Sequence, residues 1–438
     1  MALSKKPVTG MRDILPAEMQ IRDYVIGVIK ETYAKFGFTS IETPCVENIA
    51  NLTNKQGGEN EKLIFKILKR GEKLTAALQG DSQQTGEGQD GKNKDGAATT
   101  VEASLADGGL RYDLTVPLVR YYSNHANELP SPFKALQIGN VWRADRPQKG
   151  RYRQFMQCDI DILGEPTNLA EIELILATTT TLGKLGFRGF QIRINDRRIL
   201  KAMAAYSGFP EEAYDQVFII LDKMDKIGAD GVAEELVDSG FSKESADRYM
   251  ALFAGLHQAQ DGIAYLTETL GDVMESEVAE NLTEIIAGVG ATKCSDFELV
   301  FDPTLVRGMS YYTGTIFEIA MPELGISCGG GGRYDKMVGK FTGNDVPACG
   351  FSIGFERIIL ILTEKGFTVP NMKKQAYLIE KGLPTERLCE VIAQAQRERE
   401  SGTQVLVARM NKNKKFQKEQ LAADGYTEIH EFYRNPLQ

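Results

Sequence analysis

A cluster of basic side chains at positions 143–153 is the part of the sequence best suited to chemistry. The net charge of these eleven residues is +4. Guanidinium groups bind phosphate and carboxylate oxygens in pairs, so the cluster is consistent with binding of a polyanion. A solvated hairpin tip would carry the same charge, and the cluster alone does not decide between the two. The basic residues are Arg143, Arg146, Lys149, Arg151 and Arg153, with Asp145 as the acid among them.

The segment that follows the cluster adds acidic and amide groups to one face of a predicted strand. Side chains alternate between the two faces of a strand, so Gln157, Asp159 and Asp161 share one face and the apolar residues between them share the other. At about 3.3 Å per residue, Gln157 and Asp161 lie roughly 13 Å apart, enough to contact both ends of an amino acid. Two carboxylates and an amide beside an arginine cluster indicate a site for a zwitterion together with a polyanion.

Two further stretches contain polar side chains suited to a binding site. In RYDLTVPLVRYY, Asp113 and Thr115 are two residues apart and share a face if the segment is extended, although an ordinary strand end would look the same. LVRGMSYYTGTIFE combines Arg307 with the neighbouring pair Tyr311 and Tyr312.

Two more stretches that could contribute to a binding site are rich in glycine. The four consecutive glycines 329–332 allow the backbone to lie flat against a ligand, but a turn or a linker explains such a tract equally well. The tract does not match the phosphate-loop pattern, which requires GK followed by Ser or Thr. In GFSIGFERI, Arg357 lies just inside a predicted helix, either on the helix surface or as a phosphate clamp.

Strands and helices that could position these residues can be assigned from the periodicity of the sequence. Residues 133–142 and 152–163 are predicted to form a long antiparallel hairpin. Residues 17–36 have apolar side chains at helical spacing and are followed by Gly37. The next segment, GFTSIETPCVE, is predicted to be a strand interrupted at Pro44. GFSIGFERIILILTEKGF is typical of a strand that enters a helix.

Three regions differ in composition or periodicity from the segments described above. Residues 197–290 have helical patterns and few strand signals, which predicts an inserted helical module. Residues 80–109, within a longer insertion 71–109, have a net charge of −4 and almost no large apolar side chains. Such a segment cannot offset its ordering entropy, so we expect a mobile surface insertion, with a regulatory or partner-binding loop as the alternative. From residue 371 the order β-α-β-α-β predicts a small α/β domain.

Composition sets the remaining limits. The chain has 438 residues, which suggests about three domains. No apolar run reaches 18 residues, so we expect no membrane partner, and the N-terminus lacks the apolar stretch of a signal peptide, which predicts a cytoplasmic location. The six cysteines show no CxxC and are expected to be free thiols. The overall charge of −9 argues weakly against a nucleic-acid partner, but it conceals +3 from residue 371 onward and +4 on the hairpin tip.

Taken together, these stretches resemble the class II aminoacyl-tRNA synthetases and, within that class, the histidyl-tRNA synthetases. The hairpin with RPQKGRYRQF resembles the second class motif, GFSIGFERI the third, and the first helix with IETPCVE the first, dimer-forming motif. LVRGMSYYTGT and GGRYD resemble two stretches peculiar to the histidine enzymes. The resemblance covers residues 8–366 except 71–109 and is weaker beyond 371.

The resemblance implies an α+β fold with three parts. A catalytic domain built on an antiparallel sheet would comprise residues 1–196 and 291–367. Residues 197–290 would form a helical insertion domain, and residues 371–438 an anticodon-binding-like α/β domain that is shorter than is usual in the family.

The resemblance also implies a two-step reaction. The carboxylate of L-histidine would attack the α-phosphate of ATP to give histidyl-adenylate and pyrophosphate, and the histidyl group would then pass to histidine tRNA. Mg²⁺ would bridge the phosphates of ATP, with no protein side chain assigned as a metal ligand. A homodimer is expected.

By similarity, each motif residue has a role. Asp113, Thr115 and Gln157 would hold the substrate ammonium group, and Asp161 and Tyr312 the two imidazole nitrogens, with Tyr311 beside them. Arg143 and Arg307 would be catalytic, on the two sides of the α-phosphate. The full assignment is histidine binding by Asp113, Thr115, Arg143, Gln157, Asp161, Arg307, Tyr311 and Tyr312; ATP binding by Arg143, Arg151 and Arg357; and contact with the tRNA acceptor end by Arg146 and Gln148.

A catalytically silent paralogue is the alternative. Synthetase-like regulatory subunits of ATP phosphoribosyltransferase and histidine-sensing kinase domains usually lose the arginine stretch and the paired tyrosines. This chain retains Arg307, Tyr311, Tyr312 and Arg333.

Overall fold

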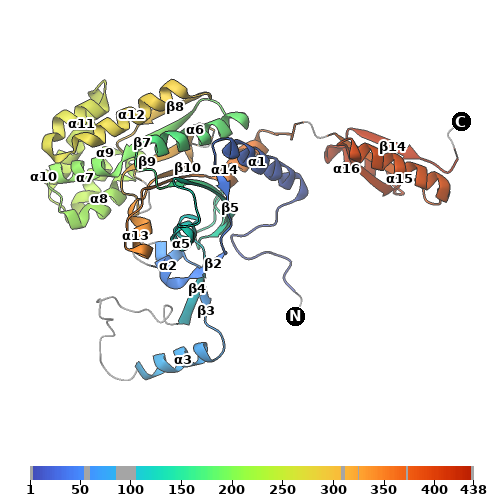
Figure 1. Cartoon of the computed structure of the whole chain (residues 1–438), viewed down its shortest axis with the longest axis horizontal. Helices are drawn as coiled ribbons and strands as arrows, with labels where there is room; N and C mark the ends of the chain where they lie inside the picture. The colour runs from blue at the N-terminus through green and yellow to red at the C-terminus, as the bar shows by residue number, and fades with distance from the viewer. Residues whose placement is uncertain are drawn as a thin grey trace. The chain divides into compact units, whose positions relative to one another are not determined.

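The structure is a computed structural model that describes residues 3–53, 60–84, 105–306, 311–323, 325–370 and 373–435 (Figure 1). The chain divides into two compact units. The first joins Met1–Asp13 to Val25–Ile361, and the second joins Ile14–Tyr24 to Leu362–Gln438.

A mixed eight-stranded sheet forms the centre of the first unit. Its six inner strands pair antiparallel, and only the two edge strands pair parallel to their neighbours. This arrangement confirms the predicted α+β fold built on an antiparallel sheet. In order across the sheet, the strands are β1 (Thr39–Ser40), β5 (Phe133–Trp142), β6 (Gln154–Leu163), β11 (Ala348–Ile353), β10 (Ile326–Arg333), β9 (Thr315–Met321), β7 (Phe190–Asp196) and β8 (Phe297–Phe301).

The predicted hairpin is β5 paired with β6, and the alternation along β6 separates an apolar face from a polar face. Cys158, Ile160 and Ile162 are almost fully buried. Tyr33 of helix α1 (Pro16–Lys35) lies near Cys158 and near Thr178 of helix α6 (Leu169–Lys184), and α6 contacts β6, so these two helices cover the apolar face. The opposite face of β6 is left to carry the polar side chains.

A smaller sheet and several helices complete the body of the first unit. The small sheet has the order β2-β4-β3 and is antiparallel. Its strands are β2 (Val46–Asn48), β3 (Lys66–Leu68) and β4 (Ala106–Leu110), and the further helices are α2 (Ile49–Thr53), η1 (Asn60–Leu63), α3 (Glu72–Gln84), α5 (Thr115–His125), α13 (Lys336–Thr342) and α14 (Phe355–Glu364).

Residues 197–292 form helices without a strand, as the helical pattern predicted, and every residue of this region is described. The helices lie together beside β7 and β8 in Figure 1. Side chains of Asp196, Ser242 and Asp261 accept hydrogen bonds from backbone amides in the first turns of three of them. The helices are α7 (Arg197–Ser207), η2 (Glu211–Ala213), α8 (Tyr214–Leu221), α9 (Met224–Asp238), α10 (Lys243–Gln258), α11 (Gly262–Leu270), η3 (Gly271–Val273) and α12 (Ser276–Thr292).

The sequence-based prediction is wrong at two places in the body. The predicted strand GFTSIETPCVE contains only the two residues of β1 and the start of β2, because the segment around Pro44 leaves one sheet and enters the other. Asp113 and Thr115 do not lie in an extended segment. Thr115 begins helix α5, and the Asp113 carboxylate accepts a hydrogen bond from the amide of Val116 at 3.1 Å.

The predicted mobile insertion is structured at both of its described ends. Helix α3 occupies residues 72–84, and β4 begins at the buried Ala106. The glycines of β4 allow close packing: a Cβ on Gly109 would lie 2.8 Å from Leu52 Cδ1. At Gly108 and Gly109 the glycines serve packing, and the central part of the predicted insertion, residues 85–104, lies outside the described residues.

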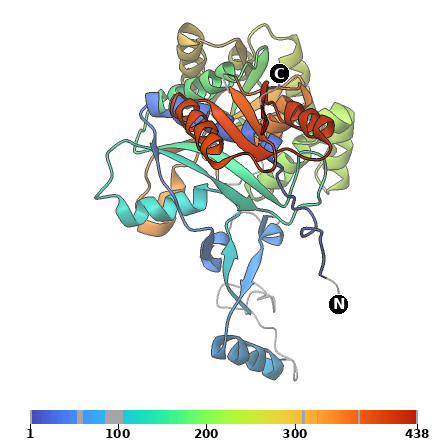
Figure 2. The same ribbon diagram turned by 90° about the vertical axis from the view of Figure 1, so that its right-hand side faces the viewer.

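The tail of the second unit has the predicted β-α-β-α-β order. Its three strands are parallel, in the order β13-β12-β14, and Figure 2 shows a helix on each side of them. Tyr377 and Ile379 of β12 pack towards one helix, and Ala376 and Leu378 pack towards the other. The elements are β12 (Lys374–Ile379), α15 (Thr385–Glu400), β13 (Gln404–Arg409), α16 (Lys414–Ala423) and β14 (Glu428–Phe432).

None of the helices in the described ranges is both long enough and apolar enough to cross a membrane.

Candidate active site

A cavity of about 530 Å³ lies over the polar face of the central strands. Its walls come from β6, β10 and β11, the segment before α5, the turn between β5 and β6, and the start of α14. The volume falls within the usual range of about 300–1,000 Å³ for small-molecule sites.

Most of the predicted site residues line this cavity, although they come from distant parts of the sequence. Two predicted residues, Arg146 and Gln148, belong to the β5–β6 turn but not to the lining. Arg307 lies outside the described residues. The predicted residues in the lining are Asp113, Thr115, Arg143, Arg151, Gln157, Asp161, Tyr311, Tyr312, Arg357 and the first three of the four glycines 329–332.

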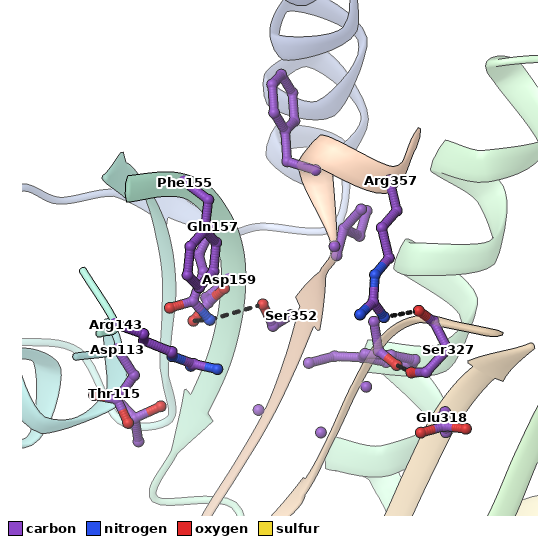
Figure 3. Close-up of a pocket in the computed structure, with 18 of the residues that line it drawn as sticks. Asp113, Thr115, Arg143, Phe155, Gln157, Asp159, Glu318, Ser327, Ser352 and Arg357 are labelled. Atoms are coloured by element: carbon purple, nitrogen blue, oxygen red, sulfur yellow. Dashed lines mark hydrogen bonds between the residues drawn. The ribbon is translucent and has the colours of Figure 1, made fainter. Parts of the chain in front are cut away.

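Arg143 is held between two aromatic rings at the end of β5. Its guanidinium carbon is 4.2 Å from the ring centre of Tyr112 and 5.2 Å from that of Phe155, and its Nε donates to the Tyr112 carbonyl at 3.1 Å. Within the described part of the chain, its two terminal nitrogens donate to no protein acceptor. The guanidinium group of Arg143 is therefore fixed in place, and its two terminal nitrogens are available to an anion (Figure 3).

The other two cavity arginines have protein partners. Arg151 donates from Nε and NH2 to both oxygens of Asp145, at 3.1 and 2.9 Å. Arg357 donates to the carbonyl of Ser327 and lies across the cavity from Arg143 (Figure 3). The cavity therefore contains three guanidinium groups, and that of Arg143 lies between two aromatic rings.

Among the carboxyl groups of the lining, three lie near one another and are buried. Asp113, Asp159 and Asp161 are 2%, 5% and 3% exposed. Burial raises the pKa of Asp113, although the amide of Val116 and the charge of Arg143 lower it. Burial also raises the pKa of Asp161 to about 7, against a hydrogen bond from Tyr334 that lowers it.

Asp159 has the least favourable surroundings for a charge. Burial raises its pKa well above the usual range, and the neighbouring Asp161 raises it further, while a hydrogen bond with Ser352 lowers it. Asp159 Oδ1 and Asp113 Oδ2 are buried and find no hydrogen-bond partner among the residues that the structure describes. Buried acceptors without partners are costly, which indicates that a ligand rich in donors completes the site.

The carboxamide of Gln157 connects the acids to β11. Its Nε2 donates to Ser352 Oγ at 3.2 Å and to Asp159 Oδ2 at 3.4 Å (Figure 3). Its Oε1 is buried and has no hydrogen-bond partner in the described ranges. The amide therefore offers an acceptor to the cavity.

Tyrosines enclose the acidic end. The rings of Tyr311 and Tyr312 are 4.9 Å apart, and Tyr311 is 6.1 Å from Tyr334, which donates to Asp161 Oδ1 at 2.6 Å. Burial raises the pKa of Tyr311 well above its usual range, with a hydrogen bond to Thr115 acting against it. The phenols of Tyr311 and Tyr334 are therefore neutral donors at physiological pH.

Glycines are required where the strands and Asp161 approach most closely. A Cβ on Gly350 would lie 2.0 Å from Asp161 Oδ1, and a Cβ on Gly331 would lie 1.8 Å from the Gly350 carbonyl oxygen. The glycine tract 329–332 belongs to β10, so its explanation as a turn or linker is wrong. Part of the tract serves strand packing as well as the cavity wall.

Several lining residues were not predicted as site residues. The alternation along β6 places Asp159 between Gln157 and Asp161, but the resemblance assigned it no role. Ser352 is opposite Asp159 only through the β6–β11 register, which the sequence does not reveal. The other unpredicted polar or aromatic residues of the lining include Tyr112, Phe155, Glu318, Tyr334 and Glu356.

No group of three or more His, Cys, Asp or Glu side chains within the described ranges could hold a metal ion. Glu318 is a carboxylate of the lining on the Arg357 side (Figure 3).

Comparisons with known proteins are consistent with one another. A family model described as histidyl-tRNA synthetase matches residues 80–358. A histidine–tRNA ligase of Leifsonia xyli subsp. xyli is 43% identical, over 97% of this chain and 95% of that protein. The crystal structure of histidyl-tRNA synthetase from Nostoc sp. aligns with a TM-score of 0.74 at 25% identity, covering 97% of this chain and 90% of that one.

A third protein shares the fold. A Bacillus halodurans chain, described as an ATP phosphoribosyltransferase regulatory subunit/histidyl-tRNA synthetase, aligns with a TM-score of 0.73 at 20% identity over 98% of this chain and 99% of that one. At that identity the likeness concerns the fold alone.

Proposed function

The chain belongs to the histidyl-tRNA synthetase family, and we propose that its cavity binds L-histidine and ATP side by side. The protein activates histidine to histidyl-adenylate with release of pyrophosphate and transfers the histidyl group to histidine tRNA. The regulatory alternative is not favoured, because the relative that matches nearly the whole chain at 43% identity is a histidine–tRNA ligase.

One observation supports this use of the cavity most directly. Two buried acceptors without partners, Asp113 Oδ2 and Gln157 Oε1, lie in the same cavity as the terminal nitrogens of Arg143, and no described residue pairs with these atoms. The charge of Arg143 acts on Asp113, so the two groups are close. An amino acid would supply an ammonium group to the acceptors and a carboxylate to the guanidinium.

The histidine side chain would be recognised by Asp161 and Tyr312, with Tyr311 beside them. Tyr334 donates to one oxygen of Asp161 and so orients the carboxyl group. An analogue that lacks the imidazole nitrogens would leave a buried acid and a phenol unpaired, which costs factors of about 10⁴ in specificity. A site of this kind needs no editing domain.

ATP would lie along the part of the cavity that contains the arginine side chains. Arg143 would contact both the substrate carboxylate and the α-phosphate, Arg307 would lie on the other side of that phosphate, and Arg151 and Arg357 would hold the remaining phosphates. Joining two anions builds charge on phosphoryl oxygens, so fixed guanidinium groups would supply much of the acceleration. Mg²⁺, when bound, would neutralise phosphate charge; phosphate oxygens would be its main ligands, with Glu318 in reach of that end.

The remaining parts would serve tRNA binding and assembly. Arg146 and Gln148 would contact the acceptor end, since they lie on the exposed β5–β6 turn that borders the cavity. Residues 1–196 and 291–367 would act as the catalytic domain, with residues 197–290 as an insertion domain that contacts tRNA. Residues 371–438 would contact the anticodon, and the chain would act as a cytoplasmic homodimer.

Exchange of labelled pyrophosphate into ATP tests the proposal. We expect exchange by the purified protein to depend on L-histidine and to be far slower with other amino acids. Exchange without an amino acid, or at equal rates with several, would contradict the assignment of the cavity. Arg248→Ala, on the exposed surface of α10, provides a control variant that should exchange normally.

A further inference from the structure

We infer that Asp159 and Ser352 are positioning residues that hold the carboxamide of Gln157 with its oxygen facing the bound amino acid. The inference rests on the proposed function in one respect, because it takes the ammonium group of the substrate as the donor to Gln157. Neither residue needs to contact the substrate to act in this way.

The donors of Gln157 are fully used within the protein. An amide nitrogen has two hydrogens, and Nε2 has two acceptors, Ser352 Oγ at 3.2 Å and Asp159 Oδ2 at 3.4 Å. Ser352 lies on the side of the amide that faces β11 (Figure 3), and Asp159 lies on β6 with Gln157. Oε1 is then left without a partner among the described residues and buried in the lining of the cavity.

The opposite orientation of the amide would be unfavourable. While Asp159 is ionised, turning the amide over would place Oε1 against a carboxylate oxygen of Asp159, so that two acceptors would meet in a buried site. It would also present the N–H groups of Gln157 to the cavity, where an incoming ammonium group would meet donors instead of an acceptor. Asp159 can accept from Nε2 through Oδ2 whether or not its other oxygen carries a proton.

The register of the sheet keeps the three groups together. Asp159 pairs directly with Ser352 across β6 and β11, and Gln157 lies two residues before Asp159 on the same face of β6. Gln157 Nε2 donates to both Asp159 and Ser352, so the amide connects the carboxyl group to the serine. The three side chains therefore form one network fixed by the two strands.

Loss of this network should affect KM for histidine and leave KM for ATP nearly unchanged. Without the network the amide can adopt both orientations, and only one of them accepts from the ammonium group. We expect Ser352→Ala and Asp159→Ala to raise KM for histidine by about tenfold or more in pyrophosphate exchange, with KM for ATP changed less than about twofold. Asp159→Asn retains an acceptor at this position and should recover most of the loss.

A double-mutant cycle separates positioning from direct contact. In a Gln157→Ala background, Ser352→Ala and Asp159→Ala should change KM for histidine by less than about twofold, because the group they act through is gone. Additive losses in that background would overturn the inference and assign a direct contact instead. A normal KM in the single Ser352→Ala and Asp159→Ala variants would also overturn it.

Two further measurements exclude a general loss of structure. Inhibition by 3-(imidazol-4-yl)propanoate, which lacks the ammonium group, should be unchanged in both variants; an equal loss for this analogue would contradict the inference. Ile160→Val alters the opposite, buried face of β6 and should leave KM for histidine unchanged. If Asp159→Ala does not fold, Ser352→Ala tests the inference alone, because it removes one acceptor with little change in volume.

Absence of histidine-dependent exchange in the wild-type protein would refute the proposed function itself. This outcome is distinct from failure of the double-mutant cycle.

Discussion

Replacing Asp161 by asparagine is expected to stabilise the ligand-free protein at neutral and alkaline pH. Asparagine has nearly the same shape and keeps an oxygen that accepts from Tyr334, which donates to Asp161 Oδ1 at 2.6 Å. The substitution removes only the negative charge. A gain in stability from the loss of a predicted site residue would show that this carboxylate is retained for a purpose other than folding.

The pKa of Asp161 sets the size of the effect. Burial raises that pKa from the usual 3.8 to about 7, with the nearby carboxylate of Asp113 adding to the rise. One pKa unit corresponds to about 1.4 kcal/mol, so ionised Asp161 costs the folded state about 4 kcal/mol relative to the unfolded chain. Asp161 also raises the pKa of Asp159, so its neutralisation relieves a second buried acid.

The sign of the pH dependence follows from the proton count. Between pH 3.8 and about 7, the folded chain holds a proton on Asp161 that the unfolded chain has lost, so stability falls as the pH rises through this range. Above about pH 7 both states are ionised and the cost is complete. The advantage of Asp161→Asn should therefore grow from acid to neutral pH and level off above about pH 7.

Thermal unfolding of the ligand-free protein measures this difference. The difference in Tm between variant and wild type should be near zero at about pH 4 and reach several degrees at about pH 8, with all buffers at the same ionic strength. Asp247→Asn, an exposed acid on α10, is the matched control and should show no such trend. A variant that is destabilised at all pH values, or a difference independent of pH, would refute the argument from burial. Histidine-dependent exchange by Asp161→Asn should be lost or much reduced.

Four other substitutions test the remaining parts of the site. Arg143→Lys should lower kcat of pyrophosphate exchange by about 10² with an unchanged Tm, because lysine lacks the planar fork; a normal kcat would exclude bidentate contact. Arg307→Ala should lower the adenylation rate by at least about 10² while calorimetry still detects histidine binding, and an unchanged rate would refute its role. Arg357→Ala should raise KM for ATP about tenfold with little effect on KM for histidine, whereas equal effects on both would point to a structural role. Glu171→Gln should cost about 3 kcal/mol in urea unfolding, because it leaves the buried Arg333 without the carboxylate that it contacts at 2.6 and 2.7 Å; a cost below about 1 kcal/mol would contradict this.

The parts of the fold that were predictable are those in which one periodicity runs for many residues. The β5–β6 hairpin has ten residues in each strand, and every second residue of β6 from Met156 to Ile162 is apolar, so both its extent and its apolar face followed from the sequence. The helical region and the tail were predictable for the same reason. Short elements such as β1 and β4 carry too few residues to show a period, and their existence depends on partners distant in sequence.

The site was predictable in its residue types but not in its connections. Charge and alternation identified Arg143, Gln157 and Asp161 as members of one site. The conformation at Asp113 was missed because its carboxylate caps the backbone of a helix, a local interaction that competes with the extended state. The contact between Gln157 and Ser352 joins residues 195 positions apart and exists only through strand register. Sequence spacing therefore identifies functional groups, whereas the orientation of each group depends on cross-strand neighbours.

The charges of the cavity explain why its side chains are a costly arrangement for the folded protein. Three buried acids face one another with raised pKa values, while only the charge of Arg143 acts on both Asp113 and Asp159. A bound amino acid would bring an ammonium group to the acceptors and a carboxylate to Arg143, so each charge that it buries would meet an opposite charge already in place. The binding energy then depends on groups that are fixed before the ligand arrives, which is the property that transition-state stabilisation requires. The same preorganisation accounts for the tight packing of Gly350 against Asp161, because a side chain there would displace the carboxylate from the position in which its charge is useful.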